Sequence, residues 1–180
     1  FRRVLFRSPK VWRQKCHMCF REDTLLYVLG QLVAVLEARK EWLKDAGCDN
    51  LDAFNEATGE GLPRLIFACD EVAELLDRTG RSKEDKERLN QIENRLATLA
   101  RLGRAFGIHL ILATQRPDAN ILPGQIKNNM DFRVCGRADS ILSGIILDNT
   151  SAAEQIPKDA RGRFITGDGT VFQAYYMEGL

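Results

Sequence analysis

Residues 64–77 read RLIFACDEVAELLD, an unbroken apolar run followed by two adjacent acids and then by apolar residues at helical spacing. The run Leu65–Cys69 does not alternate with polar residues, which is typical of a strand covered on both faces. An unpaired carboxylate at the end of such a strand is costly. Asp70 and Glu71 therefore either cap and solvate the start of the following helix or face a cation such as the magnesium of a nucleotide. The motif alone leaves both interpretations open.

Leucine periodicity predicts the longest helix of the chain, over residues 24–46. Asp23 is the expected N-cap of this helix, and Gly47 is the residue expected to end it. Residues 48–63 are polar and glycine-rich, which predicts a surface connection up to the apolar run.

The rest of the chain alternates further helical patterns with short apolar runs. Helices that alternate with buried strands predict an α/β fold with a mainly parallel sheet, flanking helices and a C-terminal β-hairpin. The expected elements are a helix over 86–105, a buried strand over 108–114, a short strand over 133–137, and a hairpin of 163–166 with 170–176 around a glycine turn.

Two of the predicted strands end in polar residues that belong at the same edge of the sheet. The first strand ends in Asp70 and Glu71, and the second is followed by Gln115 and Arg116. Ligands of open parallel sheets bind at the carboxyl ends of the strands. There an acid can hold Mg²⁺ through a water, and a second acid can orient or deprotonate an attacking water. Gln115 and Arg116 would then contact the γ-phosphate and neutralise developing charge.

Composition narrows the class of protein only slightly. The chain has 180 residues, a net charge of +1 and five cysteines. This charge excludes a strong basic field over the whole molecule, although a local basic patch would suffice for nucleic acid. The odd, scattered cysteines predict a reduced, cytoplasmic setting, and no apolar run reaches the roughly 20 residues of a membrane helix. Cys16 and Cys19 form a CxxC without the other ligands of a zinc site, so we interpret them as small apolar thiols.

Several motifs occur in the same order as in a known family. They are the strand ending in Asp70-Glu71, GRAFGIHL at 103–110, LATQRP at 112–117, GQIKNN at 124–129 and ILD at 146–148. Over about residues 24–176 the chain resembles the FtsK/SpoIIIE family of DNA-translocating ATPases. The tail from Asn149 onward looks most like the branch of this family found in conjugative elements.

This resemblance implies a RecA-like P-loop NTPase core and assigns roles at the sheet edge. Asp70 and Glu71 correspond to the Walker B motif, with Asp70 associated with Mg²⁺ through a water and Glu71 as the catalytic glutamate. Gln115 corresponds to the sensor that reads the γ-phosphate of ATP.

The resemblance also assigns roles to basic residues away from this edge. Arg104 matches an arginine of the family, although Phe106 replaces the family's alanine two positions later. Arg133 and Arg137 match arginines that face the nucleotide of a neighbouring subunit. Lys127 matches a position suited to contact the DNA backbone. A surface or helix-end role remains open for each of these basic residues.

The phosphate-binding loop of such an ATPase is missing from the sequence. No glycine begins the pattern G-x-x-x-x-G-K-[ST], and the nearest match, Gly162 to Gly167, continues into Asp168. We therefore expect a partial ATPase domain over 24–180, truncated at its start and inactive alone, preceded by a basic segment over 1–23. The first eight residues match nothing in the family and are expected to be foreign.

The resemblance implies that the intact protein is a DNA translocase using ATP and Mg²⁺. Its implied partners are double-stranded DNA, further copies of itself in a ring, expected to be a hexamer, and membrane-bound transfer or division machinery reached through regions outside this chain. The motor would lie on the cytoplasmic face of the membrane. Two alternatives stay open, namely a protein-secretion ATPase of the same superfamily and a non-catalytic nucleotide- or DNA-binding remnant.

Overall fold

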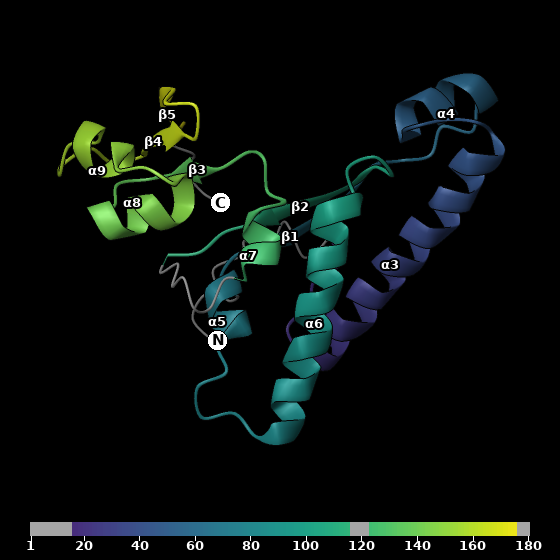
Figure 1. Cartoon of the computed structure of the whole chain (residues 1–180), viewed down its shortest axis with the longest axis horizontal. Helices are drawn as coiled ribbons and strands as arrows, with labels where there is room; N and C mark the ends of the chain where they lie inside the picture. The colour runs from purple at the N-terminus through teal and green to yellow at the C-terminus, as the bar shows by residue number, and fades with distance from the viewer. Residues whose placement is uncertain (1–15, 116–122, 176–180) are drawn as a thin grey trace.

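The computed structural model describes residues 16–115 and 123–175, which form two groups of packed elements (Figure 1). Arg116 and most of the basic segment 1–23 lie outside the described residues. The first group contains α3 (Glu22–Asp45), α4 (Leu51–Thr58), β1 (Leu65–Cys69), α5 (Val72–Leu76), α6 (Lys83–Leu102), β2 (Ile108–Leu112) and α7 (Gly124–Lys127). The second contains β3 (Val134–Cys135), α8 (Ser140–Leu147), α9 (Ser151–Gln155), β4 (Arg163–Thr166) and β5 (Val171–Gln173).

The predicted long helix is confirmed as α3, but its start was misplaced. The helix begins at Glu22 with Arg21 as its N-cap, so the prediction of Asp23 as the cap is wrong. Asp23 instead lies in the first turn, where an acid interacts favourably with the helix dipole, and it pairs with Arg88 of α6 at 3.2 Å. Gly47 follows the C-cap with a φ of +65°, as expected of a residue that ends a helix.

The predicted surface connection over 48–63 contains a helix, α4. The Asn50 side chain accepts a hydrogen bond from the Ala53 backbone at 2.9 Å and caps this helix. Leu51 and Phe54 are buried on one face of α4. Two apolar residues three positions apart are a weak signal in a polar stretch, and only packing against the neighbouring elements makes them decisive.

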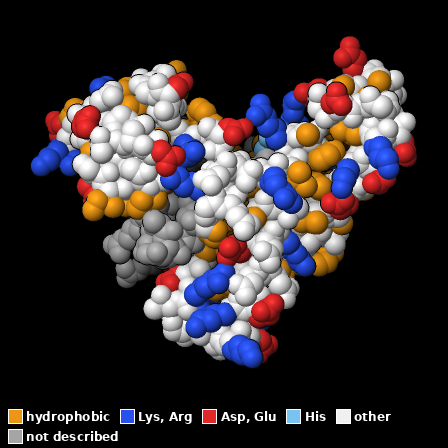
Figure 2. All heavy atoms as spheres, viewed as in Figure 1, with side chains coloured by type: hydrophobic (Ala, Val, Ile, Leu, Met, Phe, Trp, Pro, Cys, Tyr) orange, Lys and Arg blue, Asp and Glu red, His pale blue; other side chains and the backbone are white. Residues whose placement is uncertain are grey.

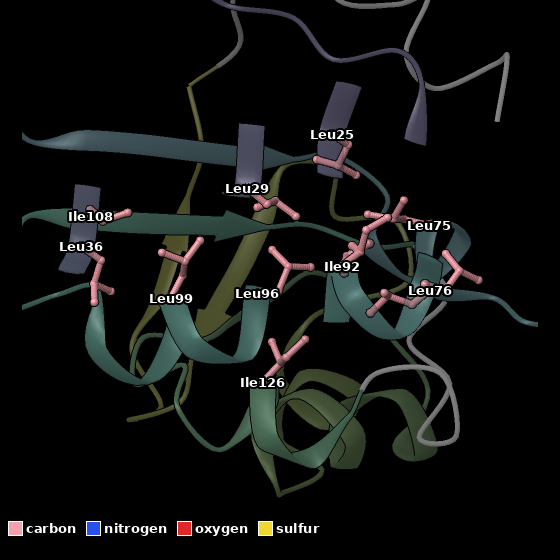
Figure 3. Close-up of a cluster of buried hydrophobic side chains, with 12 residues drawn as sticks. Leu25, Leu29, Leu36, Leu75, Leu76, Ile92, Leu96, Leu99, Ile108 and Ile126 are labelled. Atoms are coloured by element: carbon pink, nitrogen blue, oxygen red, sulfur yellow. The ribbon is translucent and has the colours of Figure 1, made fainter. Parts of the chain in front are cut away.

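α6 packs along α3, and together the two helices supply most of the main core (Figure 3). α6 is capped by Ser82, whose hydroxyl accepts from the Asp85 backbone at 3.1 Å, so it starts earlier than the predicted residue 86. Figure 3 shows side chains from α3, α5, α6, α7 and β2 converging on one apolar volume. The fully buried members include Leu29, Leu36, Leu89, Ile92, Leu96 and Ile126.

β1 and β2 pair in parallel over their whole length, with Leu65 opposite Ile108 and Cys69 opposite Leu112. Alternate residues of both strands, including Phe67 and Leu110, pack on the helical core. The opposite face is open in the described part of the chain, since Ile66 is 68% and Ile111 56% exposed. The expectation that β1 is covered on both faces is therefore wrong for these residues, because the core elements pack on the same face of the pair.

The second sheet is antiparallel, in the order β3-β4-β5. The β4–β5 pair confirms the predicted C-terminal hairpin, and Gly169 occupies its turn with a φ of +88°. Parallel pairing is thus limited to β1–β2 among the described residues, and the expectation of a mainly parallel sheet does not hold there. The fold is mixed α/β, with a small parallel and a small antiparallel sheet.

A buried arginine ties α3 to the starts of both parallel strands. Arg39 is only 4% exposed, and its guanidinium donates to the Pro63 and Phe106 carbonyls, both at 2.7 Å. Burial lowers the pKa of Arg39 from its usual value, although an arginine keeps its charge in proteins. Since Pro63 precedes β1 and Phe106 precedes β2, Arg39 fixes the amino ends of the pair, and the opposite ends carry the acids.

Candidate functional site

Glu71 links the carboxyl ends of the two parallel strands. Its carboxylate accepts the backbone N–H of Gln115 at 3.0 Å through Oε2 and the hydroxyl of Thr114 through Oε1. The backbone pairing continues to this point, since Ala113 donates to the Cys69 carbonyl at 2.8 Å and accepts from Val72 at 3.0 Å. The structure therefore brings together Glu71 and Gln115, as the sequence predicted for this sheet edge.

Neither acid caps the following helix. Glu71 occupies the N-cap position of α5, but its side chain makes no capping hydrogen bond. Asp70 is exposed and has neither a hydrogen bond nor an ion pair within the described ranges. Helix capping, one of the two interpretations left open by the sequence, thus accounts for neither carboxylate.

Asp70 offers the kind of donor that Mg²⁺ takes in nucleotide sites. Its carboxylate oxygens have no partner within residues 16–115 and 123–175, whereas each oxygen of Glu71 accepts a hydrogen bond. Mg²⁺ bound with a nucleotide typically keeps several waters and uses one or two carboxylates together with the phosphates. No group of three or more metal-binding side chains occurs among the described residues. An exposed carboxylate therefore fits a metal that arrives with its nucleotide, not one held by a protein cage.

The remaining groups at this edge have clear but limited roles. The Gln115 side chain is exposed and available to a ligand. Burial, the largest effect, raises the pKa of the Cys69 thiol to about 11, so this cysteine stays protonated near neutral pH and is a poor nucleophile. All five cysteines are free thiols.

Arg104 lies away from these acids. It precedes β2, at the strand end opposite to Glu71, and it pairs with Asp131 at 3.1 Å. Both side chains are largely exposed, at 83% and 77%. Arg137 is exposed between β3 and α8 and has no ion pair with any residue that the structure describes. Arg104 therefore lies at the wrong end of the strand pair to contact Glu71 of the same chain.

Lys127 and Arg133 converge on one acid, Asp148. The Lys127 ammonium and the Arg133 guanidinium each lie 2.5 Å from a different oxygen of the Asp148 carboxylate. Arg133 also donates to the Met130 and Ile146 carbonyls, both at 3.1 Å, so its guanidinium has three partners within the chain. Lys127 further lines a groove of about 500 Å³ between α7 and α8. Asp148 was not predicted as the shared partner, although it belongs to the ILD motif at 146–148.

The Asp148 ion pairs should make part of the stability depend on pH. Hydrogen bonds from Lys127 first, and then from Arg133, hold the pKa of Asp148 below its ordinary value of about 3.9. A lowered pKa in the folded chain means stabilisation above the unfolded value and its loss as the pH falls through the folded value. Asp148→Asn should therefore lower Tm at pH 7, and this difference should shrink as the pH is taken from about 4 to 2. Circular dichroism melts of the variant and the wild type at pH 7 and at about pH 2 test this. A difference in Tm of equal size at these two pH values would contradict it.

The visible face of the molecule mixes both signs of charge (Figure 2). Lys and Arg side chains alternate with Asp and Glu, without a continuous basic surface on this side. None of the helices in 16–115 and 123–175 combines the length and hydropathy that a bilayer crossing requires.

These observations define a class of domain, namely a mixed α/β domain with an acidic site at the ends of two parallel strands. The family model described as the FtsK/SpoIIIE family matches residues 22–119. The chain is 35% identical over 129 residues to the DNA translocase FtsK of Campylobacter jejuni, which covers 69% of this chain and 13% of that protein. The chain therefore belongs to the FtsK/SpoIIIE family of ATPases, and it spans only a small part of this curated relative.

Solved structures agree with this assignment. The pCW3 conjugation coupling protein TcpA, in a monomer form with ATPγS, is 41% identical, with a TM-score of 0.81 over 87% of this chain and 45% of that one. The cytoplasmic domain of the type VII secretion ATPase EccC of Thermomonospora curvata is 25% identical, with a TM-score of 0.59 over 82% of this chain and 17% of that one. Relatives of the chain thus occur among DNA translocases, conjugation proteins and secretion ATPases.

Proposed function

We propose that this chain supplies the hydrolytic half of the nucleotide site of an ATP-driven DNA translocase, acting in conjugative transfer or chromosome segregation. The observation that carries the proposal is the pair of unequal carboxylates at one strand end. Glu71 is anchored by two donors just beyond the end of β2, and Asp70 is exposed without a partner among the described residues. Such a difference in environment is typical of two acids with different roles.

Within this proposal, Glu71 orients and deprotonates the attacking water, and Gln115 contacts the γ-phosphate. Asp70 holds Mg²⁺ through a water, and the cation would neutralise charge on the phosphates. No glycine of the chain begins a phosphate-binding loop, so a RecA-like core with that loop would require sequence outside these 180 residues. We infer that the 180-residue chain alone hydrolyses no ATP.

The proposed assembly is a ring, with six copies as the expected number, that encloses double-stranded DNA. The exposure of Arg104 and Arg137 suits a role across a subunit boundary, whereas Arg133 would first have to leave its three partners. Lys127 would contact the DNA backbone, and phosphate would compete with Asp148 for its ammonium. The similarity to TcpA favours a conjugative element, with the motor on the cytoplasmic side of a membrane-bound machine.

The decisive experiment measures ATP hydrolysis by the longer polypeptide that carries this chain together with a phosphate-binding loop. Linear double-stranded DNA should stimulate the turnover by about tenfold or more, because substrate binding energy can drive the closure that assembles a catalytic site. An acidic polypeptide added in place of the DNA is the control for negative charge alone.

A secretion ATPase is the second candidate, because the similarity to EccC covers most of the chain. In that alternative the cargo is a polypeptide, and DNA should leave the turnover unchanged. Hydrolysis without DNA stimulation would therefore exclude the translocase and favour secretion, whereas no hydrolysis under any condition would favour a non-catalytic remnant.

A further inference from the structure

The Thr114 side chain takes part in the acidic site through its contact with Glu71. Thr114 lies two residues beyond the end of β2 and is half-buried. Its hydroxyl donates to Oε1 of Glu71, while the next backbone N–H, that of Gln115, donates to Oε2 at 3.0 Å. Each oxygen of the carboxylate therefore has its own donor on the neighbouring strand.

This arrangement fixes a side chain that would otherwise be free to rotate. A glutamate has three rotatable side-chain bonds. A single hydrogen-bond donor therefore leaves its carboxylate able to turn about that hydrogen bond. Two donors at separate points define both the position and the plane of the group. A carboxylate oxygen has two lone pairs, so one on each oxygen of Glu71 stays available to a water.

The donors are themselves held by the backbone pairing of the two strands. Ala113, directly before Thr114, bonds to the Cys69 carbonyl at 2.8 Å and accepts from Val72 at 3.0 Å. Glu71 lies between these two partners in sequence, so the same pairing positions the acceptor and both donors. The Gln115 donor is a backbone N–H, which any residue except proline supplies. The Thr114 hydroxyl, in contrast, depends on the identity of the side chain at position 114.

We propose that Thr114 is a positioning residue for Glu71, holding its carboxylate in the orientation needed toward the attacking water. The proposal rests on the hydrolytic role of Glu71 proposed above. Thr114 acts through Glu71 and not on the nucleotide, so its removal should affect the chemical step and leave nucleotide binding intact. Valine keeps the shape of threonine but removes the donor, and serine keeps the donor.

The kinetic test uses the longer polypeptide with its phosphate-binding loop, with double-stranded DNA present. Thr114→Val should lower kcat for ATP about 10- to 100-fold, because a misplaced catalytic group costs on the order of 100-fold in rate. KM should stay within about twofold, since uniform binding is untouched. The kcat of Thr114→Ser should remain close to that of the wild type. Thr114→Ala also removes the hydroxyl and should show the same loss of kcat, so it replaces Thr114→Val if valine perturbs folding. Thr98→Val, which removes a hydroxyl that donates to its own helix, is the matched control.

A second readout needs no hydrolysis and uses the 180-residue chain. Hydrogen exchange of the Gln115 amide, followed by NMR, should become at least about threefold faster in Thr114→Val, because Glu71 loses one of its two anchors. In Thr114→Ser it should stay as in wild type.

The outcomes separate this inference from the function on which it rests. Normal kcat in Thr114→Val, or a serine variant as impaired as valine, overturns the positioning role and leaves ATP hydrolysis standing. Unchanged Gln115 exchange in Thr114→Val overturns the anchoring itself. A wild-type polypeptide without any ATP turnover overturns the proposed function, whatever the exchange rates show.

Discussion

Glu71→Gln in the ATP-hydrolysing polypeptide is expected to lower turnover by at least about 100-fold, since general base catalysis contributes about 10²–10⁴ in rate. Glutamine has nearly the same shape as glutamate and keeps one acceptor oxygen for Thr114 or Gln115, but it cannot take a proton from water. The loss should therefore appear in kcat and not in the fold. Steady-state ATP hydrolysis with saturating double-stranded DNA measures kcat, and a thermal melt of the same variant tests whether the fold is intact.

The matched control is Glu87→Gln, which removes a charge of the same type from an exposed position of α6. Its turnover should equal that of the wild type. Turnover of Glu71→Gln within about threefold of the control would contradict the catalytic role, because such a small loss is well below the contribution of a general base. In that event the anchoring of Glu71 by β2 would be purely structural.

Gly107→Ala is expected to destabilise the chain by about 2–5 kcal/mol, the sum of a backbone cost of about 1–2 kcal/mol and a packing cost of about 1–3 kcal/mol. Gly107 has a φ of +69°, a conformation that costs residues with a Cβ about 1–2 kcal/mol. A Cβ at this position would also lie 2.2 Å from Cδ2 of Leu51 and 3.2 Å from Nη1 of Arg39. The added methyl group would thus press on both α4 and the arginine that fixes the starts of β1 and β2.

Gly47→Ala separates these two costs. Gly47 has a φ of +65°, and nothing lies within 4 Å of the position that its Cβ would occupy. Its substitution should therefore cost only the backbone part, about 1–2 kcal/mol. Urea unfolding of both variants of the 180-residue chain compares them directly. Equal losses would show that Leu51 and Arg39 yield without cost, contrary to the packing described here.

The acidic site was predictable because its signals are local. The apolar run before Asp70 and Glu71 and the one before Gln115 each end in polar residues, and parallel strands place such ends together. The contact between Glu71 and Gln115 confirms that reasoning, although it uses the backbone N–H of Gln115 and not its side chain. Thr114 carried no separate signal, since a threonine at the end of a strand is ordinary. Whether Asp70, Glu71 and Gln115 act on ATP stays a prediction.

Errors arose where tertiary contacts decide between weak local preferences. Asn50, Leu51 and Phe54 form a capped helix in a stretch whose composition indicated a loop, because burial of one apolar face outweighs a polar average. Ile66 and Ile111 looked buried, since an apolar run does not reveal which faces of a sheet are covered. The pairing of β3 with the predicted hairpin was not foreseen, since β3 has only the two residues Val134–Cys135 and gives little signal of its own.

The sequence by itself determined the long helices α3 and α6, both parallel strands and the family, because leucine periodicity, unbroken apolar runs and ordered motifs are properties of short segments. The tertiary structure alone decided what each charged side chain faces. It placed Glu71 against Thr114, gave Asp148 to both Lys127 and Arg133, and buried Arg39 beneath the starts of β1 and β2. A charge finds its partner across the fold, so its role depends on which distant segments the packed core brings within a hydrogen bond of it.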